Sequence, residues 1–89
     1  MAIVTLRYWA AAKEAAGTAE ETVSAETLAE ALAVARGQAG GGEQDERLRA
    51  VLARSSFLID AAPVGARAPE SVGLSDGSVI EVLPPFAGG

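Results

Sequence analysis

Residues 74–89 read LSDGSVIEVLPPFAGG, and this stretch decides how the rest of the chain is interpreted. Apolar and polar residues alternate over 78–83, a pattern that predicts a strand with one face inward. Asp76-Gly77 precedes this strand and indicates a turn. Pro84-Pro85 follows it, and because proline cannot donate to a sheet ladder, the strand is expected to end there.

Beyond the prolines the sequence finishes on Gly88-Gly89. Two prolines favour the extended polyproline II geometry, so the tail is expected to be stiff at its root. Glycine has no Cβ, and two of them can pass through a narrow channel. The six residues from Pro84 reach at most about 20 Å. We therefore expect a domain over 1–83 and an extended tail over 84–89, the alternative for the tail being a frayed end.

Upstream patterns predict the remaining elements. The expected elements are a strand at 3–9, a short helix at 10–17 ended by Gly17, a second strand at 20–24 paired with the first, a main helix at 24–37 with Ser24 as N-cap, a second long helix at 43–55, and a strand at 56–60. This order predicts an α+β fold. We expect a mixed, curled sheet with the main helix across one face, and an extra helix.

Composition excludes most catalytic chemistry. The 89 residues include no Cys and no His, which removes disulfides, thiol nucleophiles, the usual zinc ligands and Ser-His dyads. We therefore expect no metal site, and an isolated chain that is not an enzyme. The loop at 38–42 reads QAGGG and lacks the Lys and Ser/Thr of a phosphate-binding loop.

Charge and hydropathy limit the partners and the compartment. The net charge of −5 provides no basic surface for nucleic acid. No apolar run reaches 18 residues, so we expect no membrane span. The opening MAIVTLRYW does not follow the pattern of a secretory signal peptide, and the expected location is the cytoplasm.

The carboxylate of Gly89 is the remaining candidate for chemistry. A C-terminal carboxyl group has a reference pKa of about 3.3–3.7, and its anion is a poor electrophile. It reacts only after activation, for example as a mixed anhydride with a nucleotide. Because this chain has no nucleotide-binding motif, a separate enzyme would have to activate it.

The stretch LSDGSVIEVLPPFAGG resembles the C-terminal signature of the molybdopterin synthase small subunits, the MoaD-type sulfur carriers. The first strand followed by WAAAKEAAGT is similar to that family's first strand and short helix. The resemblance implies a ubiquitin-like β-grasp fold. It also implies that an E1-like adenylyltransferase uses ATP to adenylate Gly89, and that a sulfur relay converts the carboxylate to a thiocarboxylate.

The resemblance further implies a partner, the large subunit of molybdopterin synthase, in a heterotetramer. That subunit would receive the tail, and the sulfur would pass to a pyranopterin precursor of the molybdenum cofactor. No cofactor would be bound; the glycyl adenylate and the thiocarboxylate would be transient modifications. The implied sites are Gly89 as sulfur donor, the tail residues Gly88, Ala87, Phe86, Pro85 and Pro84, and Leu83 and Trp9 as partner-binding residues.

The sequence departs from the family pattern at two turns. Many relatives have an acidic residue where Ser78 stands, and an Asn-Gly turn where this chain has Asp60-Ala61-Ala62-Pro63. For Trp9 and Leu83, packing in the core is the competing interpretation, and Phe86 could fold back on its own domain.

Three other functions stay open at this point. The first is a sulfur carrier for another pathway, such as thiamin thiazole synthesis, cysteine synthesis or tRNA thiolation. The second is a ubiquitin-like protein modifier joined through Gly89 to lysines of its targets. The third is a β-grasp binding module with an inert terminus.

Overall fold

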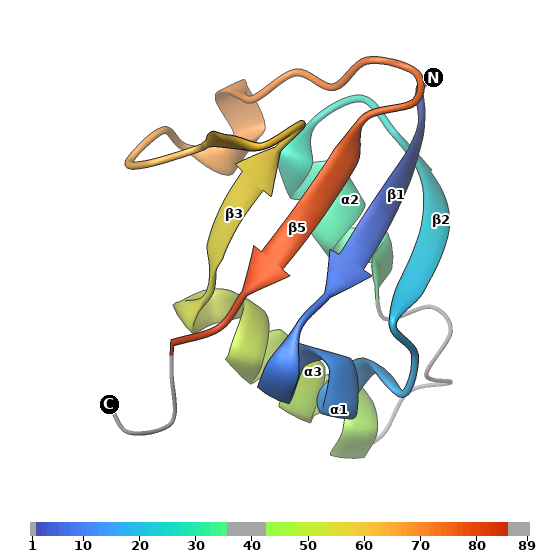
Figure 1. Cartoon of the computed structure of the whole chain (residues 1–89), viewed down its shortest axis with the longest axis vertical. Coiled ribbons are helices and arrows are strands. Elements are labelled where there is room, and N and C mark those ends of the chain that lie inside the picture. The colour runs from blue at the N-terminus through green and yellow to red at the C-terminus, as the bar shows by residue number, and fades with distance from the viewer. Residues whose placement is uncertain (1, 36–42, 86–89) are drawn as a thin grey trace.

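The computed structural model describes residues 2–35 and 43–85, and five strands in this part of the chain form one sheet in the order β2-β1-β5-β3-β4 (Figure 1). The strands are β1 (Ala2–Tyr8), β2 (Glu20–Ala25), β3 (Ser56–Ile59), β4 (Ala62–Pro63) and β5 (Val79–Leu83). β1 and β5 run parallel at the centre of the sheet. β2 pairs antiparallel with β1, and β3 pairs antiparallel with both β5 and β4.

Among the described residues, three α-helices and the 3-10 turn η2 pack around the sheet. They are α1 (Ala10–Ala16), α2 (Leu28–Val34), α3 (Glu43–Arg54) and η2 (Pro69–Ser71). In Figure 1, α2 lies across the back of the sheet, while α1 and α3 lie together beyond the end toward which β1 and β5 both run. The expected α+β architecture is therefore confirmed, with α2 as the main helix.

The core is mostly aliphatic and lies between the inner face of the sheet and the helices. Alternation along β1 buries Val4, Leu6 and Tyr8, and alternation along β5 buries Ile80 and Val82. The helices contribute three further sets of buried side chains: Ala12, Ala15 and Ala16 from α1, Leu28 and Ala31 from α2, and Leu48 from α3. Small alanines on α1 allow this helix to pack close to its neighbours. None of the helices described has the length and hydropathy needed to cross a bilayer.

The start of the main helix differs from the prediction. Ser24 is not its N-cap, because β2 continues through Ala25 and Ser24 pairs with Ile3 in the sheet. Thr27 is the N-cap, and its hydroxyl accepts a hydrogen bond from the Glu30 backbone N–H at 3.2 Å. Ser24 and Ala25 therefore form strand hydrogen-bond pairing with β1 instead of a first helical turn, and the helix begins at Leu28. The expected end at 36–37 lies outside the described residues.

The two departures from the family pattern both have a local structural basis. Asp60 and Ala61 adopt φ values of 50° and 72°, the left-handed pair that a two-residue hairpin between β3 and β4 requires. The Ser78 hydroxyl is buried and accepts from the Ser75 N–H at 3.2 Å, which closes the turn before β5. Gly77 in that turn has φ 89°, as a glycine readily allows. The predicted turn at Asp76-Gly77 is confirmed.

Candidate functional site

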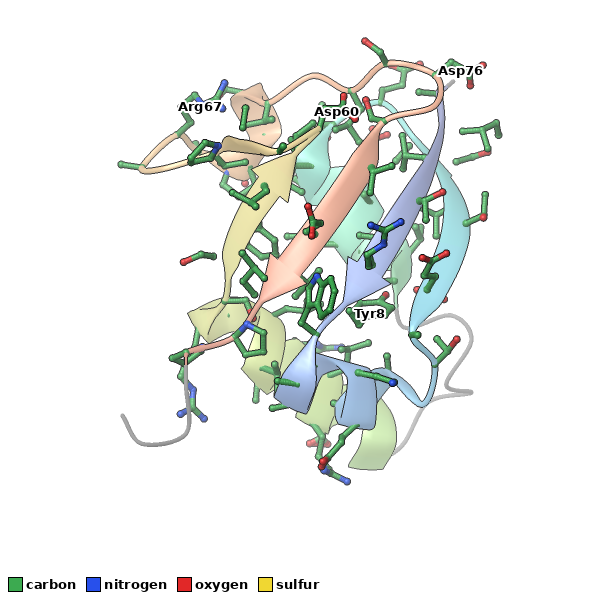
Figure 2. All side chains as sticks on the ribbon, viewed as in Figure 1. Tyr8, Asp60, Arg67 and Asp76 are labelled. Atoms are coloured by element: carbon green, nitrogen blue, oxygen red, sulfur yellow. The ribbon has the colours of Figure 1, made fainter. Side chains whose placement is uncertain are left out.

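The candidate site lies where β1 and β5 end side by side. Tyr8 is level with Val82 in the parallel register, so the residues that follow, Trp9 and Leu83, are neighbours. The Trp9 backbone N–H donates to the Val82 carbonyl at 3.3 Å. Figure 2 places Tyr8 at this end of the sheet, next to α1 and α3, and Asp60 and Asp76 at the opposite end.

Four apolar residues enclose a hollow of about 290 Å³ at this end: Trp9, Ala10, Leu83 and Pro84. We call it the root hollow, because the predicted tail begins at Pro84. Trp9 is 46% exposed, Leu83 is half-buried and Pro84 is buried. Pro85, the last residue described, is exposed. The domain therefore holds the first proline of the tail against its own surface.

Local backbone geometry fixes the position of Trp9. Trp9 is the N-cap residue of α1, and its carbonyl accepts from the Ala12 N–H at 3.0 Å. Ala10 adopts φ 47°, a left-handed conformation that is uncommon for a residue with a Cβ. This sharp change of direction takes the chain from β1 directly into α1. Strained residues of this kind concentrate at functional sites, where surrounding structure holds them in place.

A polar group borders the hollow on the open face of the sheet. The Trp9 indole Nε1 donates to Glu81 Oε1 at 3.2 Å, which orients the ring. Arg7 lies beside Glu81 in the β1–β5 register and forms an ion pair with Glu20 Oε2 at 3.0 Å. Both side chains of this pair are about half exposed, so the pair adds at most about 1 kcal/mol to stability. Its position gives the surface around the hollow a polar rim.

A buried polar pair lies beneath the site, on the inner face of the sheet. The Tyr8 hydroxyl donates to Glu21 Oε1 at 2.6 Å and lies 3.5 Å from the Ala35 carbonyl. Glu21 is 8% exposed, and its Oε2 has no hydrogen-bond partner in the described part of the chain.

Burial determines how this pair titrates. Burial raises the pKa of the Glu21 carboxyl, and the hydrogen bond from Tyr8 offsets part of that rise. Burial also raises the pKa of the Tyr8 hydroxyl, and its bond to the Glu21 carboxyl and that group's charge raise it further. Tyr8 therefore stays protonated and acts as the donor.

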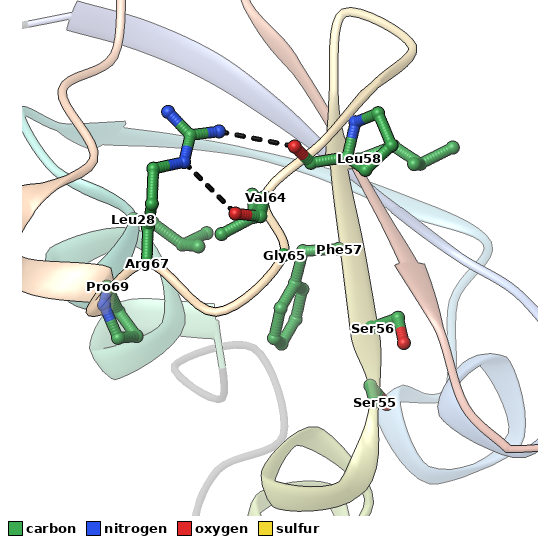
Figure 3. Close-up of a pocket in the computed structure, with 10 residues that line it drawn as sticks. Leu28, Ser55, Ser56, Phe57, Leu58, Val64, Gly65, Arg67 and Pro69 are labelled. Carbon is green, nitrogen blue, oxygen red and sulfur yellow. Dashed lines mark hydrogen bonds between the residues drawn. The ribbon is translucent and has the colours of Figure 1, made fainter.

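A second pocket of about 310 Å³ lies along the outer edge of β3 (Figure 3). Leu28, Phe57 and Val64 line its apolar part. The Arg67 guanidinium stands at one end, with Nε donating to the Val64 carbonyl at 3.0 Å and Nη2 to the Pro63 carbonyl at 3.3 Å. These bonds hold the loop after β4, so the geometry assigns Arg67 a structural role.

The structure brings three of the sequence-predicted site residues together: Trp9, Leu83 and Pro84. Trp9 lies at the surface, so it is not part of the core. Four others, Phe86, Ala87, Gly88 and Gly89, lie outside the described residues, and their roles stay predictions.

Sequence reasoning missed Ala10, Glu81 and Glu21. The alternation of 20–25 places Glu21 on the same face as Val23 and Ala25, and that pattern could have identified a buried carboxyl group. Ala10 carried no such signal, because nothing in an alanine run indicates a left-handed residue.

No known family model matches the sequence, and no curated protein matches it either. Solved structures do match. The small archaeal modifier protein 1 (SAMP1) from Methanosarcina acetivorans is 24% identical, with a TM-score of 0.79 over 100% of this chain and 98% of that one. SAMP1 from Haloferax volcanii is 17% identical, with a TM-score of 0.76 over 98% and 99%.

A chain from the complex of subunits 1 and 2 of the molybdopterin-converting factor from Helicobacter pylori also matches. It is 23% identical, with a TM-score of 0.68 over 98% of this chain and 99% of that one. These likenesses show that the chain has the ubiquitin-like β-grasp fold.

Proposed function

We propose that this chain is the sulfur-carrier subunit of a molybdopterin synthase, with the carboxyl group of Gly89 as the group that carries sulfur. The observation that carries the proposal is the junction of β5 with the tail. The central strand leads directly into a buried Pro84 and an exposed Pro85, four residues before Gly89. A terminus held in this way at its root is suited to delivery into a second protein.

The chemistry of the chain supports the same assignment. Without Cys or His, the described surface offers no thiol or imidazole that could accept sulfur. The terminal carboxylate can accept it in two steps. ATP and the carboxylate give the glycyl adenylate and pyrophosphate, and hydrosulfide from a sulfur donor then attacks the glycyl carbonyl and displaces AMP, which leaves the thiocarboxylate. An E1-like adenylyltransferase supplies the nucleotide site for the first step.

In the proposed transfer, the thiocarboxylate enters the active site of the large subunit and gives its sulfur to a pyranopterin precursor. The sulfur, once bonded to the precursor, is still joined to the Gly89 carbonyl carbon as a thioester, and hydrolysis of this acyl–sulfur bond returns the Gly89 carboxylate and leaves the sulfur on the precursor. Gly88 and Gly89 suit this step because they lack side chains and fit a narrow channel. The chain contributes a substrate, and the large subunit contributes the catalytic groups.

The root hollow and its rim are the proposed contact surface for the large subunit. Tryptophan is enriched at interface hot spots, and a polar rim commonly surrounds such a centre. The matched Helicobacter pylori complex of subunits 1 and 2 supports a partner of this kind. The net charge of −5 favours a partner with a basic surface.

Reconstituted sulfur transfer tests this proposal. The chain, a large subunit, an E1-like enzyme, ATP, a sulfur source and the pyranopterin precursor should together form the dithiolene product. A variant with one residue appended after Gly89 keeps the same fold but blocks the carboxyl group, and it should form none. Equal product from the two proteins would refute the assignment of Gly89.

A ubiquitin-like modifier is a second candidate, favoured by the two SAMP1 structures among the matches. Here Gly89 would form an isopeptide bond with a target lysine, releasing AMP from the adenylate. Because Arg67 is the last basic residue, trypsin would leave residues 68–89 as the branch on the modified lysine. Mass spectrometry of cell lysates for that branch distinguishes a modifier from a sulfur carrier.

A further inference from the structure

The pocket along the outer edge of β3 shares no lining residue with the root hollow, and the proposed function does not use it. Its apolar floor comes from Leu28 and Val64, which are buried, and from the half-buried Phe57. In Figure 3 the Phe57 ring projects from β3 toward Leu28 and Pro69. Ligand pockets typically combine an apolar floor of this kind with a few polar groups at fixed positions.

The first polar group is a backbone N–H of β3. Asp60 donates its backbone N–H to the Val79 carbonyl at 2.9 Å, and this bond sets the alternation of hydrogen bonds along β3. The backbone groups of Phe57 therefore point away from β5, toward the outer edge. The Phe57 carbonyl accepts from the Val64 N–H at 3.0 Å, as this alternation requires. Regular antiparallel pairing would add a second bond, from the Phe57 N–H to the Val64 carbonyl.

Arg67 takes the place of that second bond. Its Nε donates to the Val64 carbonyl at 3.0 Å, and its Nη2 donates to the Pro63 carbonyl at 3.3 Å. The β3–β4 pairing ends at Pro63, and within residues 2–35 and 43–85 the Phe57 N–H has no acceptor. An unpaired N–H at the edge of a sheet is a donor that the carbonyl of an added peptide can satisfy.

The second polar group is the Arg67 guanidinium, which determines the charge of the ligand. Arg67 is the one charged residue of the pocket lining, and no carboxylate in the described part of the chain forms an ion pair with it. Its bonds to two backbone carbonyls hold the guanidinium in place and leave other N–H groups on it for a ligand. A guanidinium held in this way forms strong, charge-assisted hydrogen bonds with a carboxylate.

We propose that this pocket binds an extended, acidic segment of a partner protein. One carbonyl of the segment accepts from the Phe57 N–H, an apolar side chain covers the floor, and an aspartate or glutamate pairs with Arg67. Val64 bonds to Phe57 through its N–H and to Arg67 through its carbonyl, so a segment of a few residues reaches both polar groups. A peptide supplies a carbonyl, an apolar side chain and a carboxylate together, whereas a simple anion supplies only the last.

The experiment starts from a displayed library of random peptides, selected on the full chain. The enriched sequences are synthesised with capped ends and titrated into the isotope-labelled chain, and NMR of the backbone amides and of arginine Nε gives the contact site and the Kd. Two changes remove the charge pair: the acidic residue of the peptide becomes its amide, and the chain carries Arg67→Ala. Arg47→Ala is the matched control, because Arg47 is exposed on α3 and does not line the pocket.

The expected peptides carry an acidic residue close to an apolar one. They should shift the signals of Phe57, Val64 and Arg67 and slow the hydrogen exchange of the Phe57 amide. Either removal of the charge pair should raise the Kd about tenfold or more, because a hydrogen bond to a charged group is lost. Arg47→Ala should change the Kd by less than about twofold.

Three results would overturn the proposal. The first is a selection that enriches no peptide contacting this pocket. The second is an equal Kd for the acidic peptide and its amide form, a comparison made on the unmodified chain and therefore independent of any effect of Arg67→Ala on the loop. The third is acetate shifting the same signals with the same Kd as the peptide, which would make the pocket a site for small anions. None of these measurements depends on Gly89, so they leave the sulfur-carrier proposal to its own test.

Discussion

Replacement of Glu21 by Gln should make the protein more stable at neutral pH and less sensitive to pH. The Glu21 carboxyl is buried, accepts one hydrogen bond from Tyr8, and has no partner for Oε2 among the described residues. Burial raises its pKa in the folded state. The unfolded chain exposes the group, and its pKa there is the ordinary value of about 4.3.

The sign of the effect follows from proton binding. Above the unfolded pKa and up to the raised folded pKa, the folded state holds more protons than the unfolded state. The free energy of unfolding therefore falls as pH rises through this window. The stabilising contribution of the protonated carboxyl is complete below about pH 4 and is lost as pH rises through the folded pKa. The Glu21→Gln variant has no ionisable group at this position, so its free energy of unfolding does not fall through this pH window.

A buried acceptor without a partner costs about 1–3 kcal/mol, and an ionised one costs more. We take about 1–2 kcal/mol as the gain for Glu21→Gln at pH 8, because the new amide brings its own unsatisfied N–H groups. For a domain of this size that corresponds to a rise in Tm of roughly 4–16 °C. At pH 4 both proteins carry a neutral group, and the gain should vanish.

Circular dichroism followed through thermal and urea unfolding between pH 4 and pH 8 measures this difference. Glu20→Gln is the matched control, because Glu20 is adjacent in sequence but exposed in its ion pair with Arg7. That control should change the free energy of unfolding by no more than about 1 kcal/mol. A gain for Glu21→Gln that is independent of pH, or that grows as pH falls, would refute the reasoning.

Two further substitutions test the surface and the turn. Trp9→Ala should weaken binding of the large subunit by about 2 kcal/mol, roughly 30-fold in Kd, with little change in Tm, because Trp9 is 46% exposed. Ile3→Ala removes a similarly exposed residue at the other end of β1 and should leave the Kd measured by calorimetry unchanged. Equal losses of affinity for the two variants would rule out a contact centred on the root hollow. Gly77→Ala should lower stability by about 1–2 kcal/mol, because a Cβ is disfavoured at φ 89° even though nothing lies within 4 Å of it. At Gly73 a Cβ would also have nothing within 4 Å, but φ is not positive there, so Gly73→Ala should leave the free energy of unfolding in urea nearly unchanged. Equal losses of stability at both glycines would show that backbone conformation is not the cause.

The central strands could be predicted from sequence because their alternation is regular. The inward positions of β1 and β5 are buried as that pattern requires, and Pro84 ends the last strand as expected. The same alternation places Trp9 on the open face, opposite Tyr8. Local patterns of this kind depend only on a period of two residues and on burial of one face.

The start of α2 could not be predicted in the same way. Ser24 is a good N-cap residue in isolation, but in the structure it pairs with Ile3, which lies 21 residues earlier in the chain. The buried pair of Tyr8 and Glu21 likewise depends on the β1–β2 register, which local sequence does not specify. The root hollow requires two strand ends to meet in the parallel β1–β5 pairing, and this contact is long-range.

Intact mass of the chain after incubation with an E1-like enzyme, ATP and a sulfur source tests the central claim most directly. Exchange of one oxygen for sulfur on the terminal carboxyl should add about 16 Da. Fragmentation should place the added mass on Gly89, and omission of ATP should abolish it. An unchanged mass, under conditions in which the same enzyme converts a carrier known to be its substrate, would contradict the account.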